Sequence, residues 1–114
     1  MKKVLIIEDE AILLRLLLKI LEKHFEIICA NNGQEGIELL DESVDLVLTD
    51  LMMPYKSGKE VVIESKKYPN IKIIVLSSIH LENNVIELFE LGIDDYIRKP
   101  FIPKELLFKI KKLI

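Results

Sequence analysis

Three acidic residues, one hydroxyl and one lysine stand at the ends of separate apolar runs in this chain of 114 residues. Glu8 and Asp9 follow the first run, and Asp50 closes a second. Ser77 and Lys99 end two further runs. Carboxylates that are brought together repel one another. A hard divalent cation such as Mg²⁺, which prefers oxygen ligands, is the simplest way to neutralise their charge. An acidic trio with a nearby lysine and hydroxyl is typical of phosphoryl transfer to a carboxylate nucleophile.

The segments that must position these residues alternate between strand and helix patterns. Apolar runs bounded by turn residues predict strands at residues 3–7, 25–30, 44–49, 72–77 and 95–97. Helical periodicity predicts helices at residues 10–24, 34–41, 57–67 and 82–91, and Pro103 suits the first turn of a last helix. The core stripe predicted for the first helix consists of Leu13, Leu16, Leu17, Ile20 and Leu21.

This alternation predicts an α/β fold. Right-handed crossovers place helices on both faces of one twisted parallel sheet. Ligands of such sheets bind beyond the carboxyl ends of the strands, where the winding direction reverses. Because the five chemically suited residues all stand at predicted strand ends, the fold is expected to bring them into one pocket.

The bulk composition is that of one globular domain spanning residues 1–114. Half of the residues are hydrophobic, 31% are charged and the net charge is −3, which argues against nucleic acid as the main partner. The apolar runs are too short to span a membrane, and the first residues do not read as a signal peptide. The one cysteine, Cys29, has no partner for an internal disulfide. A reducing cytoplasm is therefore the expected location.

The ordered set of residues resembles the receiver domain of the two-component response-regulator family, in its single-domain form, over essentially the whole chain. The matching positions are Glu8, Asp9, Asp50, Pro54, Gly58, Ser77, Tyr96, Lys99 and Pro100. The resemblance implies a flavodoxin-like, doubly wound (βα)5 fold with five parallel strands in the order 2-1-3-4-5. Two departures stand out, because Glu8 replaces the commoner aspartate and Lys56 occupies a position that is usually apolar.

The resemblance also implies roles in phosphoryl transfer. Asp50 would accept a phosphoryl group from a phosphohistidine on a sensor histidine kinase or a histidine phosphotransfer protein. Asp9, Asp50 and the backbone carbonyl of Met52 would bind Mg²⁺ directly, with Mn²⁺ as an alternative ion. Glu8 would bind the ion directly or through water. Apolar side chains at Met52 and Ile79 imply slow self-dephosphorylation.

A second group of residues would convert phosphorylation into a change of shape. Lys99 would pair with one phosphoryl oxygen, and the Ser77 hydroxyl would donate a hydrogen bond to another. Tyr96 would then turn inward behind Ser77 and re-form the surface of the fourth helix, fifth strand and fifth helix for a downstream protein. The Lys99–Pro100 bond would be cis. The domain would be a monomer, with dimerisation on phosphorylation as an option.

Two other functions fit parts of the pattern. A phosphatase of the haloacid-dehalogenase type also forms an aspartyl phosphate, but it usually needs a second acid two residues after the nucleophile, where this chain has Met52. A phosphorylation-independent interaction module is the other alternative, and a pure scaffold would have no need of Asp9, Asp50, Ser77 and Lys99 together. The expected function is therefore that of a phosphoacceptor signalling domain and not of an enzyme.

Some apolar residues exceed what a core needs. Leu14 and Leu18 flank the core stripe of the first helix, which borders the phosphodonor surface in this family; burial by neighbouring helices is the alternative. Phe108 stands opposite the core stripe of the last helix, among lysines, and suggests an acidic, partly apolar partner on the output face. No output domain is expected after that helix, which leaves open a stand-alone regulator, a relay intermediate or a fragment.

Overall fold

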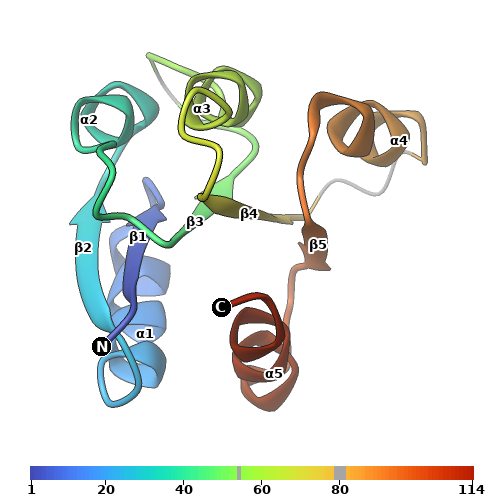
Figure 1. Ribbon diagram of the computed structural model, residues 1–114. Helices are drawn as coiled ribbons and strands as arrows, with labels where there is room; N and C mark the ends of the chain where they lie inside the picture. Colours follow the sequence, from blue (N-terminus) through green and yellow to red (C-terminus); the bar gives the residue numbers. More distant parts are fainter. Residues whose placement is uncertain (54, 79–81) are drawn as a thin grey trace.

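The computed structural model describes residues 1–53, 55–78 and 82–114, and these form one parallel five-stranded sheet flanked by helices (Figure 1). In chain order the elements are β1 (Lys3–Ile7), α1 (Ala11–Leu21), β2 (Glu26–Ala30), α2 (Gly33–Glu38), β3 (Leu46–Asp50), α3 (Gly58–Ser65), β4 (Lys72–Ser77), α4 (Glu82–Leu91), β5 (Asp95–Arg98) and α5 (Pro103–Leu113). The strand order is β2-β1-β3-β4-β5. The predicted fold class and strand order are thus confirmed.

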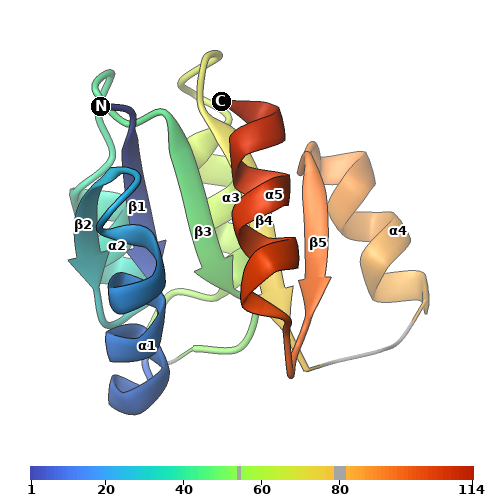
Figure 2. The ribbon, with the colours of Figure 1, turned by 90° about the horizontal axis from the view of Figure 1, so that it is seen from below.

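Helices cover both faces of the sheet. Helices α1 and α5 lie on one face, and α2, α3 and α4 lie on the other (Figures 1 and 2). Successive side chains of a strand point to opposite faces, so Val4 and Ile6 of β1 enter the core under α1 and α5. Leu5 and Ile7 enter the core under α2 and α3. This double burial explains why the strands are continuous apolar runs instead of alternating ones.

The predicted elements are all present, and their boundaries differ by a few residues. The third strand runs one residue further than predicted and ends on Asp50 itself, which makes that carboxylate part of the sheet edge. The first helix is shorter than predicted and covers Ala11–Leu21. In the described part of the chain, no helix has the length and apolar character needed to cross a membrane.

The rotation of α1 differs from the prediction. Leu16 was expected in the core stripe but is 47% exposed, whereas Leu14 packs against the core. Leu17 and Leu21 are fully buried, so the centre of the buried stripe lies between them and turns Leu16 to the flank. Leu18 is half-buried. The exposed apolar surface of α1 therefore comes from Ile12 and Leu16 instead of Leu14 and Leu18.

Candidate functional site

The sheet brings the predicted site residues to one edge. Because all strands are parallel, their carboxyl ends lie on the same side of the molecule. Glu8 and Asp9 directly follow β1, and Asp50 is the last residue of β3. Ser77 is the last residue of β4, and Lys99 directly follows β5. Residues separated by up to 91 positions in sequence thus meet at this edge.

The three carboxylates form a compact cluster. One oxygen from each of Glu8, Asp9 and Asp50 lies within 4.8 Å of the others. Glu8 and Asp50 are only 1% and 9% exposed, whereas Asp9 is open to solvent. An all-oxygen donor set with one open side suits Mg²⁺, which binds through few carboxylates and keeps several waters. The residues present therefore fit the cation that the sequence predicted.

Lys99 contacts two of the three acids. Its Nζ donates to Glu8 Oε1 at 3.0 Å and to Asp50 Oδ2 at 3.2 Å. Burial alone would lower the pKa of Lys99, but the hydrogen bond to Glu8 and the charges of Asp50 and Glu8 outweigh it and raise the pKa. The ammonium group is therefore charged at neutral pH and neutralises part of the cluster.

Burial works against the charged form of Glu8. Burial raises its pKa, and the negative charge of Asp50 acts in the same direction. Hydrogen bonds from the Glu10 backbone N–H, at 3.1 Å to Oε2, and from Lys99 offset part of this effect. One lysine does not balance three carboxylates, so the site has a deficit of positive charge that a cation can fill.

Backbone amides hold the second oxygen of Asp50, a feature that the sequence did not indicate. Oδ1 accepts from the Leu51 N–H at 2.7 Å and from the Met52 N–H at 3.4 Å. The start of α3 presses against this turn, because a Cβ on Gly58 would lie 2.4 Å from the Asp50 carbonyl oxygen and 2.6 Å from Leu51 Cα. Glycine at position 58 is thus needed to let α3 approach the end of β3.

The remaining predicted residues surround this cluster. Ser77 is buried, and its carbonyl accepts from the Lys99 N–H at 2.9 Å. The Lys99–Pro100 bond is cis, as predicted. Tyr96 lies half-buried in β5 and packs against the core under α2, α3 and α4. The side chain of Met52 is exposed beside Asp50. Two further positions that the sequence singled out, Pro54 and Ile79, lie outside the described residues.

An apolar hollow of about 220 Å³ adjoins the cluster on the α1 side. Its lining is formed by Leu13, Leu16, Lys99, Pro100, Phe101 and Pro103. Exposed Ile12 and Ile102 stand on the two segments that border the hollow. Apolar surface next to a charged cluster is typical of a place where a partner protein docks. Periodicity alone missed it because the rotation of α1 decides which leucine is exposed.

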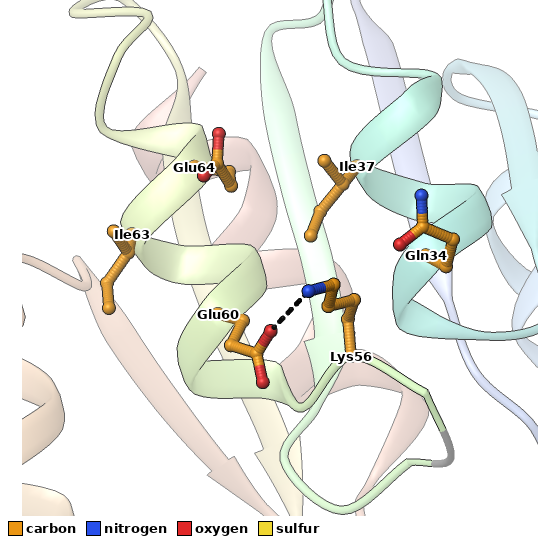
Figure 3. Close-up of a pocket in the computed structure, with 6 residues that line it drawn as sticks. All are labelled: Gln34, Ile37, Lys56, Glu60, Ile63 and Glu64. Carbon is orange, nitrogen blue, oxygen red and sulfur yellow. Dashed lines mark ion pairs between the residues drawn. The ribbon is translucent and has the colours of Figure 1, made fainter.

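A larger hollow of about 420 Å³ lies between α2 and α3 (Figure 3). Lys56, from the loop after Asp50, forms an ion pair with Glu60 of α3 at 3.4 Å (Figure 3). Glu64, at the other end of the hollow, pairs with Lys67 at 2.8 Å. The charged side chains that line the hollow are thus engaged in ion pairs, Lys56 with Glu60 and Glu64 with the neighbouring Lys67. The pair with Glu60 gives Lys56 a structural role at the start of α3.

The fold and this site together define a phosphoacceptor signalling domain of the doubly wound α/β class. The family model described as response regulator receiver domain matches residues 4–111. The chain is 40% identical to the transcriptional regulatory protein SrrA of Staphylococcus aureus over 114 residues, which cover 98% of this chain and 47% of that protein. It is 36% identical to the transcriptional regulatory protein CpxR of Escherichia coli, over 100% of this chain and 50% of that protein.

Solved structures agree with these relatives. The crystal structure of a response regulator receiver domain protein from Clostridium thermocellum superposes with a TM-score of 0.93 at 32% identity. The match covers 100% of this chain and 94% of that chain. The chain therefore belongs to the receiver-domain family of two-component response regulators and has a phosphoacceptor signalling role. It spans about half the length of the curated relatives described above.

Proposed function

We propose that Asp50 is the residue that accepts the phosphoryl group. The supporting observation is the convergence of three carboxylates and Lys99 at one strand-end edge. An oxygen of Asp50 attacks the phosphorus of a phosphohistidine on a sensor histidine kinase or a histidine phosphotransfer protein. A new O–P bond forms while the N–P bond breaks, and the imidazole leaves with the electron pair of that bond.

Glu8, Asp9, Asp50 and the backbone carbonyl of Met52 are the proposed ligands of Mg²⁺, with Mn²⁺ as an alternative ion. The bound ion supplies charge neutralisation at the transferring group. Lys99 has a complementary role. Its ammonium group contacts both Glu8 and Asp50 and offsets part of the repulsion between these buried acids and the incoming phosphoryl group. The backbone amides of Leu51 and Met52 fix the orientation of the Asp50 carboxylate.

After transfer, Lys99 exchanges its contact with the Asp50 carboxylate for one with a phosphoryl oxygen, and the Ser77 hydroxyl donates to another. Tyr96 turns inward behind Ser77, so that the local charge change biases a two-state surface. That surface consists of α4, β5 and α5. Lys109 of α5 already donates to the Tyr96 carbonyl oxygen at 3.4 Å and pairs with Asp95 at 3.6 Å. Because Lys109 links the two elements, a movement of β5 would also move α5.

The phosphodonor docks on the apolar rim that lies beside the cluster and is formed by Ile12, Leu16 and the lining of the adjoining hollow. Ile12 and Leu16 are exposed on α1 near the 220 Å³ hollow that reaches Lys99. A donor helix that covers this rim brings its phosphohistidine to the edge where Asp50 lies. Leu14 and Leu18, which were predicted for this contact, are less accessible.

The downstream partner is a protein or a further domain that binds the α4-β5-α5 surface. Two relatives are named transcriptional regulatory proteins, and a role in such regulation through a partner, without direct contact of this domain with nucleic acid, is proposed here. The receiver domain is proposed to occupy residues 1–114 and to act in the cytoplasm as a monomer, with dimerisation on phosphorylation as an option.

Acetyl phosphate with Mg²⁺, followed by intact mass measurement, tests this proposal. One added phosphoryl group is expected, and it should be absent in Asp50→Ala and after chelation of the metal. Glu42→Gln, an exposed acid away from the cluster, is the matched control and should be phosphorylated normally. No adduct in the wild-type domain would contradict the assignment and favour a phosphorylation-independent module. An equal adduct in Asp50→Ala would contradict it by placing the phosphoryl group on another residue.

A further inference from the structure

The outward face of α5 combines an aromatic ring with lysine side chains. Phe108 is 67% exposed and lies on the side opposite the fully buried Leu106 and Ile110. Lys104, Lys111 and Lys112 stand four residues before and three and four residues after Phe108, so all three lie on its side of the helix. Among residues 1–53, 55–78 and 82–114, these three lysines have no ion pair, whereas Lys109 pairs with Glu105 and Asp95.

Helix electrostatics account for only part of this arrangement. Lys111 and Lys112 lie in the last turn, where the helix dipole favours cations. Lys104 lies in the first turn, directly after Pro103, where the same dipole disfavours a cation. The exposure of Phe108 is also unfavourable, since an aromatic side chain gains from burial. The position of Lys104 and the exposure of Phe108 are both unfavourable for the stability of the domain, which indicates that this face serves a function other than folding.

The layer that carries this face has the opposite charge to the other layer of helices. Helices α1 and α5 contain six basic residues and one acidic residue, whereas α2, α3 and α4 contain seven acidic residues and one basic residue. The two layers lie on opposite faces of the sheet (Figure 1). A charge distribution of this kind orients the domain toward an acidic partner during approach.

We propose that the outward face of α5, formed by Lys104, Phe108, Lys111 and Lys112, docks an acidic protein surface with an apolar centre. Phe108 fills the apolar centre, and the lysines pair with surrounding carboxylates, as at interfaces where a few central residues carry most of the affinity. Membrane binding fits less well, because the apolar side of α5 is used by the core and the outward face presents Phe108 among lysines instead of an apolar stripe. Lys109 pairs with Asp95 and donates to the Tyr96 carbonyl oxygen, so it lies at the edge of α5 nearest β5, and Glu105 pairs with Lys109 between that edge and Phe108. This face is the outward part of α5 in the α4-β5-α5 surface, so the proposal names the chemistry of the partner of that surface and rests on the proposed function.

A designed helical peptide is the test probe. Its apolar stripe is flanked by glutamates, and the control peptide has glutamine at each of those positions. Titration into the whole ¹⁵N-labelled chain, followed by heteronuclear NMR, should shift amides along α5 with the acidic peptide and not with the control. Affinity should weaken about tenfold or more in Phe108→Ala. Lys104→Glu should weaken it similarly, and added salt should weaken binding by the wild-type chain.

Phe89→Ala removes a partly exposed aromatic from the acidic layer and is the matched control variant. It should bind the acidic peptide as the wild-type chain does. Equal binding of the two peptides, equal effects of Phe108→Ala and Phe89→Ala, or stronger shifts with anionic lipid vesicles would overturn the proposal. The NMR spectrum of Phe108→Ala should stay dispersed, as expected of a folded domain, and its phosphorylation by acetyl phosphate should be unchanged. These two results separate this proposal from the one made for Asp50.

Discussion

Replacement of Asp50 by asparagine should stabilise the metal-free domain. At an effective dielectric constant of about 20, the Lys99 contact at 3.2 Å is worth about 5 kcal/mol of attraction. Repulsion from Glu8 within 4.8 Å removes about 3.5 kcal/mol, and solvent-screened Asp9 removes about 1 to 2 kcal/mol. These contributions nearly cancel, so the unfavourable burial of a carboxylate that is 9% exposed decides the sign.

We therefore expect Asp50→Asn to raise the free energy of unfolding by about 1 to 2 kcal/mol without metal. The asparagine carbonyl keeps the hydrogen bond from Leu51, and Lys99 keeps its contact with Glu8. Urea unfolding followed by circular dichroism measures the change, with Glu42→Gln as a control that should leave stability within about 0.5 kcal/mol of wild type.

The metal should reverse this order. Mg²⁺ at one hundred times its dissociation constant adds about 2.7 kcal/mol to the wild-type domain and much less to Asp50→Asn, which has lost a ligand. A metal-free Asp50→Asn domain that is less stable than wild type by more than about 1 kcal/mol would refute the argument that the acidic cluster is short of positive charge. Equal stabilisation of both proteins by Mg²⁺ would refute the assignment of Asp50 as a metal ligand.

Three further changes follow from the geometry around the site. Gly58→Ala should destabilise the domain by about 1 to 3 kcal/mol in urea unfolding, because the new Cβ meets the Asp50 carbonyl oxygen at 2.4 Å; unchanged stability would contradict the close approach. Tyr55→Asn should stabilise by about 0.5 to 1 kcal/mol, because exposed Tyr55 has a φ of 67° that asparagine tolerates better; a loss of thermal stability would count against this. Ile12→Asp should slow phosphorylation by a histidine donor while leaving acetyl phosphate labelling intact, and slower labelling by both donors would place Ile12 in a structural role.

Much of the fold and of the site was predictable from sequence. Continuous apolar strands that end on charged residues require a covered parallel sheet, and that sheet forces Asp9, Asp50 and Lys99 to one edge. Helix rotation was less predictable. Leu14, Leu16 and Leu18 all border the α1 stripe, and contacts with the sheet and α5 decide which of them is buried.

Other features depend on geometry that sequence patterns do not contain. The sequence predicted Lys99 in the pocket but not its simultaneous contacts with Glu8 and Asp50, which depend on where a long side chain ends. The amide contacts to Asp50 and the φ of Tyr55 are properties of the loop after β3. A non-glycine residue with positive φ is uncommon, so residue type gave no signal at position 55.

The location of the phosphoryl group tests the central claim most directly. After incubation with acetyl phosphate and Mg²⁺, borohydride reduces the acyl phosphate and converts the modified aspartate to homoserine, with release of phosphate. Peptide mass spectrometry then identifies the reduced residue. Homoserine at position 50 alone is the predicted result. Homoserine at position 9, at several acids, or at none in a domain that has gained the mass of a phosphoryl group would contradict the account.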